Sequence, residues 1–305
     1  MNLFDIAWNS CVDGPGTRVV VFLKGCHLRC PWCHSPQSWS EEKTLLFFDS
    51  MCRRCGQCIA ACPEHVHEIR EGRHILHRSG CRGCGKCVQA CPYSEGGFRK
   101  SGPLSIAGDV VTPDELFTLV HPQLKLHRFD GGVTVSGGEP LLQHQEVLTF
   151  LELCRHHDFH CALETSASLK TEFIEALTDV VDLWLIGLRP LNDSVEGLAL
   201  TSDLSLVEMN ISYLKAHGKK VLIRIPIIPG YTDSLFSMDK ISSIMLRHNL
   251  EQLQLLPANP YGSHYYEASG VAFSTERKMI SDRENLNKIK GFFISKGIAA
   301  EIRQG

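Results

Sequence analysis

The sequence CHLRCPWC at residues 26–33, here called the three-cysteine loop, places three cysteines in the spacing C-x3-C-x2-C. Two further runs, residues 52–63 and 81–92, each place four cysteines in the spacing C-x2-C-x2-C-x3-C-P. Four thiolates can hold all four irons of a [4Fe–4S] cluster, whereas three leave one iron open to a non-protein ligand. A closed cluster carries electrons, and an open cluster can also act on what it binds. The sequence therefore predicts a redox enzyme with its own electron supply.

The composition is that of an ordinary globular protein. The chain has 305 residues, 43% hydrophobic and 21% charged, which suits one large domain with a small inserted module. A net charge of −3 argues against general nucleic-acid binding. The N-terminus does not resemble a signal peptide, and no stretch approaches the ~18 apolar residues of a membrane span. We therefore expect a cytoplasmic protein with no membrane or nucleic-acid partner, most of whose fourteen cysteines are metal ligands in an anaerobic setting rather than disulfides.

The two four-cysteine runs form an internal duplication. Their first cysteines, Cys52 and Cys81, are 29 residues apart, and residues 51–92 lack long periodic segments. Such a module can fold around its clusters instead of an apolar core. We therefore expect an insert at 49–100 within a larger domain formed by 1–48 and 101–305. Between Cys52 and Cys91, seven basic residues oppose three acidic ones. This excess either compensates anionic clusters or forms a docking patch for an acidic electron donor.

Outside the insert, apolar strands alternate with amphipathic helices. The predicted strands are 18–23, 133–136, 161–164, 183–188, 221–228 and 252–256. The predicted helices are 113–120 (with Thr112 as N-cap), 144–156, 171–177, 205–217, 234–247 and 282–296. Repeated βα units imply parallel strands joined by right-handed crossovers. Six units are too few to close an eight-stranded barrel, so we predict an α/β fold with a partial (β/α)6 barrel. Its site should lie at the carboxyl ends of the strands.

Zinc is the main alternative for the cysteine groups. His34 could complete a tetrahedral zinc site with the three-cysteine loop, and the two four-cysteine runs could form zinc ribbons. We favour clusters, because the spacing of the runs and their final prolines are ferredoxin-like. Three cysteines lie outside these groups: Cys154 and Cys161 are expected to be small buried hydrophobes, and Cys11 lies close to the Asp13 loop.

The three-cysteine loop, with Trp32 before its last cysteine, resembles the signature of the radical S-adenosylmethionine enzymes. The resemblance implies that Cys26, Cys30 and Cys33 hold a [4Fe–4S] cluster whose open iron chelates the methionine amino and carboxylate groups of S-adenosylmethionine. An electron from the reduced cluster would split the sulfonium to give a 5′-deoxyadenosyl radical, while the protein positions the cofactor. Residues 136–140 (SGGEP), which alone would indicate a tight bend, are similar to the family motif that holds the amino group. A carboxylate there suits an ammonium.

Further motifs narrow the resemblance. Residues 13–18 (DGPGTR), 22–26, 30–34, 130–140 and 224–230 (RIPIIPG) are similar to segments of the glycyl-radical-enzyme activating enzymes, relatives of pyruvate formate-lyase activating enzyme. The likeness covers essentially the whole chain, including an inserted small α+β ferredoxin-like domain with two clusters. It implies abstraction of an α-hydrogen from one glycine of a partner glycyl radical enzyme, because glycine has no side chain to block the approach. It also implies three [4Fe–4S] clusters, S-adenosylmethionine, and a flavodoxin or ferredoxin-type electron donor.

The ferredoxin likeness implies how the eight cysteines of the insert are shared. In two-cluster ferredoxins the fourth cysteine of each run ligates the other cluster. Each ligand set therefore takes three cysteines from one run and one from the other. Set A is Cys52, Cys55, Cys58 and Cys91, and set B is Cys81, Cys84, Cys87 and Cys62.

Two regions depart from the family pattern. The family usually has Asp-x-Lys after the fourth strand, where it contacts S-adenosylmethionine and helps to bind a monovalent cation; Gly187 and Arg189 stand there in this chain. Glycine cannot coordinate a cation, and the fork of arginine differs from the point charge of lysine. Glu164-Thr165 resembles the Asp-Thr pair of the same cation site. Asn259 falls where the family often has a histidine, and asparagine does not titrate near neutral pH. We expect S-adenosylmethionine to bind with weak or absent dependence on sodium or potassium.

The resemblance assigns the contacts to S-adenosylmethionine to Trp32, His34, Gly137, Gly138, Glu139, Glu164, Gly187, Leu188, Arg189, Arg224 and Asn259. Two other functions stay open from the sequence. One is a radical S-adenosylmethionine enzyme that modifies a different substrate. The other is an iron–sulfur electron-transfer protein whose radical site has decayed, which the departures at Gly187 and Asn259 would suit.

Overall fold

A nine-stranded, largely parallel sheet forms the centre of the fold. The computed structural model describes residues 1–96, 101–189, 202–273 and 280–303. The strand order is β13-β12-β11-β10-β9-β8-β2-β1-β7. Neighbours from β13 to β2 are parallel, whereas β1 is antiparallel to both β2 and β7. The strands are β1 (Asn2–Ser10), β2 (Arg18–Leu23), β7 (Asp109–Val110), β8 (Gly132–Gly137), β9 (Cys161–Thr165), β10 (Leu183–Gly187), β11 (Lys220–Ile227), β12 (Gln252–Pro257) and β13 (Ala299–Ile302).

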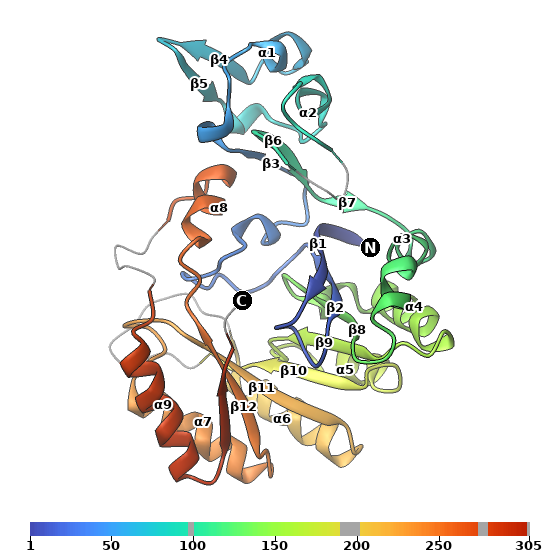
Figure 1. The fold of residues 1–305 in the computed structure, drawn as a ribbon, viewed down its shortest axis with the longest axis vertical. Coiled ribbons are helices and arrows are strands. Elements are labelled where there is room, and N and C mark those ends of the chain that lie inside the picture. Colours follow the sequence, from blue (N-terminus) through green and yellow to red (C-terminus); the bar gives the residue numbers. More distant parts are fainter. Residues whose placement is uncertain (97–100, 190–201, 274–279, 304–305) are drawn as a thin grey trace.

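Helices in the loops between these strands cover the sheet and close the main core (Figure 1). They are α3 (Pro113–Leu126), α4 (His144–His156), α5 (Thr171–Leu177), α6 (Leu204–Ala216), α7 (Leu235–Arg247) and α9 (Arg283–Ser295). The predicted strands and helices are found within a few residues of their expected bounds, except that α3 does not end at Val120. It continues through Pro122, because Leu116, Val120 and Leu124 form one buried seam at helical spacing.

Strand β2 shows why these segments become central strands. Its residues Val19, Val20, Val21 and Leu23 are fully buried, as expected for a strand covered on both faces. Arg18 at its start is also buried and donates to the Thr134 hydroxyl (2.7 Å) and the Val133 carbonyl (2.6 Å) of β8. Burial lowers the pKa of Arg18 to about 10, so it stays charged at neutral pH. The arginine therefore ties the residue 13–18 motif to the neighbouring strand.

Between β2 and β7 the chain leaves the main sheet. A short antiparallel pair, β3 (Thr44–Phe47) and β6 (Leu104–Ala107), leads out and back. Beyond it lie α1 (Gln57–Ala61), the hairpin of β4 (His67–Arg70) and β5 (Arg73–Leu76), and α2 (Lys86–Ala90), at the top of Figure 1. The two cysteine runs have the same local structure: each five-residue helix follows a left-handed glycine, Gly56 or Gly85, and ends before the fourth cysteine.

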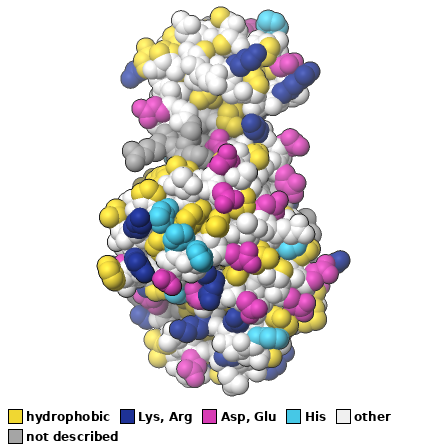
Figure 2. All heavy atoms as spheres, turned by 90° about the vertical axis from the view of Figure 1, so that its right-hand side faces the viewer, with side chains coloured by type: hydrophobic (Ala, Val, Ile, Leu, Met, Phe, Trp, Pro, Cys, Tyr) yellow, Lys and Arg dark blue, Asp and Glu magenta, His cyan; other side chains and the backbone are white. Residues whose placement is uncertain are grey.

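The surface carries mixed charge. On the face drawn in Figure 2, acidic and basic side chains are interspersed over the body of the molecule. None of the helices in the described ranges is long and apolar enough to cross a membrane.

Candidate active site

The predicted site residues follow or end neighbouring parallel strands of the sheet. The three-cysteine loop follows β2, Gly138 and Glu139 follow β8, and Glu164 lies in β9. The strands are in register at this edge: Leu23 pairs with Gly137, Thr165 with Ile186, and Gly187 with Arg224. Because carboxyl ends of parallel strands meet at one edge, segments far apart in the sequence converge here.

The three-cysteine loop is packed against the ends of two further strands. Cys30 and Trp32 are buried with Ile228 and Ala258, which follow β11 and β12, and the Trp32 ring contacts Tyr231 at 5.6 Å between centroids. Burial raises the pKa of Cys26 to about 12 and that of Cys33 to about 11. Thiolates at these positions therefore require a bound cation at neutral pH, which fits a metal cluster as their occupant.

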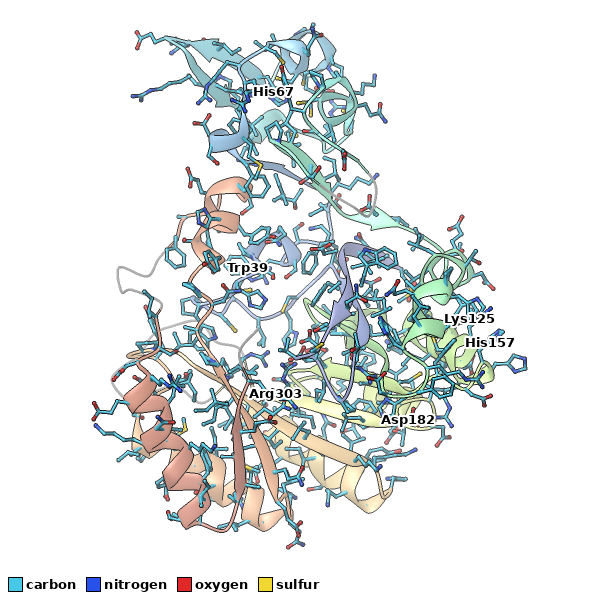
Figure 3. The ribbon with its side chains drawn as sticks, in the orientation of Figure 1. Trp39, His67, Lys125, His157, Asp182 and Arg303 are labelled. Carbon is cyan, nitrogen blue, oxygen red and sulfur yellow. The ribbon has the colours of Figure 1, made fainter. Side chains whose placement is uncertain are left out.

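The segment after the loop is held from both sides. The buried ammonium of Lys24 donates to the carbonyls of Gln37 (2.6 Å) and Ser40 (2.7 Å). Trp39 meets Tyr266 of α8 (Gly262–Ser269) edge to face at 5.8 Å between centroids, and Figure 3 shows Trp39 beside that helix. Helix α8, which was not predicted from the sequence, thus packs against the loop region.

The cysteine geometry argues against zinc in the three-cysteine loop and against zinc ribbons formed by the two four-cysteine runs. A tetrahedral zinc–thiolate site has Zn–S distances of about 2.3 Å, which keeps its sulfurs close together. In the described ranges, no three of the cysteine sulfurs lie within 4.8 Å of one another, and His34 is not part of any such group. His34 keeps accessible surface but lies among many protein atoms, so desolvation lowers its pKa; the charges that also act on it are those of Glu164, Asp13, Arg189 and Arg224.

The two glycines at the end of β8, Gly137 and Gly138, are required by packing. A Cβ on Gly137 would overlap the backbone of Leu23, and one on Gly138 would overlap the carbonyl of Gly25. The amide of Gly138 donates to the Leu23 carbonyl (2.7 Å), and that of Glu139 donates to the Gly25 carbonyl (2.8 Å). The nearest neighbour of both glycines is therefore the backbone that leads into the three-cysteine loop.

The Glu139 carboxylate is buried and held by four donors. One oxygen accepts from the Thr165 hydroxyl (2.6 Å) and the Leu141 amide (3.2 Å); the other accepts from the hydroxyl (2.6 Å) and amide (2.9 Å) of Ser166. A carboxylate offers about four lone-pair sites. Glu139 therefore fixes the end of β9, and its negative charge acts on Cys26 and His27.

The loop after β9 is a contributor that the sequence analysis missed. Ala167 is buried with a φ of 51°, a conformation that a non-glycine residue rarely adopts. The buried amide of Asn210 holds it by donating to the carbonyls of Ala167 and Leu169, both at 2.8 Å. Backbone strain supported in this way is typical of functional sites. The run Thr-Ser-Ala-Ser directly after a strand was the available signal.

Arg224 forms a buried ion-pair network. Its guanidinium contacts Glu164 at 2.7 Å and Asp13 at 3.3 Å, and donates to the Val12 carbonyl at 3.0 Å. The second oxygen of Glu164 accepts from the Ser136 hydroxyl at 2.8 Å. Both oxygens of Glu164 are therefore engaged by protein donors, and the residue 13–18 motif is joined to β9 and β11.

Arg189 occupies the space that a side chain at residue 187 would fill. Its guanidinium donates to the Gly187 carbonyl at 2.8 Å, and a Cβ on Gly187 would lie 2.7 Å from the nearer guanidinium nitrogen. Leu188 between them is buried, and its amide donates to the Arg224 carbonyl (2.9 Å). Asn259 is exposed, and its side-chain oxygen accepts from the Tyr261 amide (2.9 Å), so this hydrogen bond is local.

Two cavities in the region of α1, α2, β4 and β5, here called the upper region, separate the eight cysteines of the two four-cysteine runs. One is lined by all four cysteines of set A, and the other by all four of set B. Burial, followed by neighbouring thiols of its own set, raises the pKa of Cys58 to about 11 and that of Cys87 to about 12. Each cavity thus brings together the fourth cysteine of one run and three cysteines of the other, a donor set that fits a closed cluster.

Comparison with known proteins gives matches along the chain. Residues 82–238 match the Radical SAM superfamily, 44–92 a 4Fe-4S dicluster domain and 12–67 a 4Fe-4S single cluster domain. A 4-hydroxyphenylacetate decarboxylase activating enzyme of Clostridioides difficile (strain CD196) is 30% identical over 98% of this chain and 95% of its own length. An indoleacetate decarboxylase activating enzyme of Tractidigestivibacter scatoligenes is 34% identical over 89% of this chain and 87% of its own.

A solved structure supports the fold. A radical SAM methyltransferase from Sphaerobacter thermophilus aligns with a TM-score of 0.50 and 16% identity, over 64% of this chain and 58% of its own. The chain belongs to the radical S-adenosylmethionine superfamily and, within it, to the glycyl-radical-enzyme activating enzymes.

Proposed function

We propose that this protein activates a partner glycyl radical enzyme by removing an α-hydrogen from one of its backbone glycines. The observation that carries the proposal is the near-full-length similarity to activating enzymes, together with the convergence of the three-cysteine loop, Glu139, Glu164 and Arg224 at one sheet edge. Such similarity favours activation over the modification of an unrelated substrate. The particular partner would be chosen by surface loops that carry no readable code.

We infer a two-domain organisation around this site. The proposal is a partial (β/α)6 barrel of residues 1–48 and 101–305, with a ferredoxin-like insert at 49–100. It is supported by the open strand order and by the placement of both cysteine runs outside the main sheet. Residues 97–100, 190–201, 274–279 and 304–305 of these spans lie outside the described part of the chain.

Three [4Fe–4S] clusters are proposed, one open and two closed. Cys26, Cys30 and Cys33 would hold the open one, and sets A and B the closed ones. When bound and reduced, the open cluster supplies the electron that cleaves S-adenosylmethionine to the radical which takes the glycine hydrogen. A flavodoxin or ferredoxin-type donor would deliver electrons to the insert, whose basic excess suits an acidic protein.

The chain's own residues would bind and orient S-adenosylmethionine. The Arg189 guanidinium suits its methionine carboxylate, and Trp32, His34, Leu188 and Asn259 are proposed to line the rest of the site. Glu139 would act by fixing Thr165 and Ser166 and by placing a negative charge near the amino group. The close packing of Gly137 and Gly138 against the start of the loop holds the cysteines relative to these groups, which positions the reactants before reaction.

The crossed assignment of the insert cysteines makes a direct prediction. Cys91→Ala should give the same cluster loss as Cys52→Ala, although the two residues belong to different runs. Cys62→Ala should instead resemble Cys81→Ala. Each variant should alter or lose one insert cluster, up to about four irons per chain, and electron paramagnetic resonance of the reduced protein should sort the four variants into these two pairs. If Cys91→Ala resembled Cys81→Ala, the cavities would have been misassigned.

A second prediction concerns monovalent cations. Because both oxygens of Glu164 are engaged and Arg189 fills the space over Gly187, cleavage of S-adenosylmethionine should be unchanged when tetramethylammonium replaces potassium. The double variant G187D/R189K adds a carboxylate and removes the guanidinium, so it should gain activation by potassium. Initial rates of 5′-deoxyadenosine release measure both. A pronounced potassium requirement of the unmodified protein would contradict the prediction.

The function is tested by anaerobic reconstitution with iron and sulfide. The reduced protein should bind about twelve irons per chain, four for each cluster, and release 5′-deoxyadenosine from S-adenosylmethionine. Full iron loading without any cleavage, even with candidate partner enzymes present, would instead favour an electron-transfer protein. Gly187 and Asn259 would then mark the lost activity.

A further inference from the structure

Two buried histidines lie between the cluster cavities of the upper region. His67 in β4 and His74 in β5 are 3% and 8% exposed. Their strands pair antiparallel, with His67 opposite Leu76 and His74 opposite Ile69, so the histidines are diagonal neighbours on one face of the hairpin. Figure 3 shows His67 in this upper region, close to the hairpin.

The two imidazoles contact each other and face different cavities. Nδ1 of His67 lies 3.0 Å from Nε2 of His74, a hydrogen-bond distance. His74 lines the cavity of set A, where its Nδ1 is 3.4 Å from Sγ of Cys52 and its Nε2 is 3.8 Å from Sγ of Cys58. His67 lines the cavity of set B, and its buried Nε2 has no hydrogen-bond partner among the described residues.

Counting hydrogens along this chain of atoms gives the pair a direction. A cluster thiolate can only accept a hydrogen bond, so the contact with Cys52 calls for a hydrogen on Nδ1 of His74. A neutral imidazole carries one ring hydrogen, so a hydrogen on Nδ1 of His74 makes its Nε2 the acceptor of the 3.0 Å contact and Nδ1 of His67 the donor. Nε2 of His67 is left with a lone pair on the side of set B. A neutral pair can therefore offer a donor to one cluster but not to both.

We propose that His67 and His74 form an imidazole bridge between the two clusters of the insert, which donates a hydrogen bond toward set A and none toward set B and so separates their reduction potentials. The inference rests on the cluster assignment of the proposed function. Hydrogen bonds to cluster sulfurs are among the factors that set reduction potentials, since they stabilise the added negative charge of the reduced state. The set A cluster should thus be reduced at the higher potential.

The arrangement breaks the symmetry of the duplication. Both runs have the same helix and the same cysteine spacing, so the cysteines alone would build two similar sites. The hairpin between the runs supplies the two histidines, and the ring of Phe47 packs on His74 at 4.4 Å between centroids, which holds its orientation. A difference in potential between neighbouring clusters gives electrons a preferred direction along the insert.

The test is a redox titration of the reconstituted protein, followed by electron paramagnetic resonance. In His74→Phe the potential of the set A cluster should fall and the difference between the two insert clusters should narrow. His67→Phe removes the donor to His74. It should change the difference in reduction potential between the two insert clusters less than His74→Phe does. His77→Phe is the matched control, because His77 lies at the end of the same hairpin but its side chain is 56% exposed and pairs with Glu68. In His77→Phe the reduction potentials of both insert clusters should equal those of the unmodified protein.

A second measurement uses the unmodified protein, so it tests the inference even where a variant fails to bind iron. In the unmodified protein labelled with ¹⁵N-histidine, pulsed electron paramagnetic resonance should detect an imidazole nitrogen coupled to a reduced insert cluster. Unshifted potentials in fully loaded His74→Phe, or the absence of this coupling, would overturn the inference. So would one zinc per chain bound by Cys58, His67 and His74, whose ligand atoms lie within 4.8 Å of one another. None of these readouts uses S-adenosylmethionine cleavage, so they fail independently of the activating function.

Discussion

Replacing Cys26, Cys30 and Cys33 together by alanine should abolish 5′-deoxyadenosine formation and lower the iron content from about twelve to about eight per chain. These three cysteines belong to one hydrophobic group of side chains with Leu28, Trp32, Ile228 and Ala258. This group is separate from the two cavities of the upper region. Loss of the open cluster should therefore leave the other two intact. Iron analysis and spectra of the reduced protein measure the first effect, and product release measures the second.

Cys11→Ala is the matched control for this triple variant. Cys11 is exposed and lies outside all three cysteine groups, so iron content and cleavage should both be retained. A triple variant that still released 5′-deoxyadenosine, or that lost all of its iron, would contradict the assignment of the open cluster to this loop.

Arg224→Met should unfold or severely weaken the protein. The buried guanidinium is the shared partner of Glu164 and Asp13, whose side chains are 21% and 15% exposed. Removing one member of a buried ion pair leaves an uncompensated charge and typically costs about 3–5 kcal/mol. The free energy of unfolding, measured in denaturant, should fall by about this amount. Any folded fraction should cleave S-adenosylmethionine about 100-fold more slowly, because Glu164 and the 13–18 motif lose their shared anchor.

Arg247→Met is the control for the arginine variant. Arg247 ends α7, is 60% exposed and pairs with Glu208 on the surface, where an ion pair contributes about 1 kcal/mol or less. Its stability and cleavage should stay close to those of the unmodified protein. Equal losses in both arginine variants would show that the buried network has no special role.

Much of the main sheet could be predicted from the sequence. Some elements carry strong local signals. The apolar run of β2 predicts a buried strand, and the bounds of α4 match the predicted helix. The strands β1, β7 and β13, near the two ends of the sheet, and the helix α8 were missed. β7 has two residues, and β13 alternates exposed and half-buried positions without a continuous apolar run. Such short or mixed segments form through pairing with neighbours rather than by local preference.

The candidate site was also predicted only in part from the sequence. Cysteine spacing and the motif at residues 136–140 located the groups that the strand ends bring together. Sequence could not assign the four donors of Glu139, because Ser166 and Leu141 reach it only through the geometry of two loops. The contact between His67 and His74 depends on the register of a hairpin, and two histidines seven positions apart carry no signal of their own.

The activating function is tested most directly by following one hydrogen. A candidate partner glycyl radical enzyme would be produced with α-deuterated glycine and mixed with the reconstituted, reduced protein and S-adenosylmethionine. The account predicts that deuterium appears in 5′-deoxyadenosine as a glycyl radical signal grows in the partner. Release of unlabelled 5′-deoxyadenosine with no organic radical on the partner would contradict it.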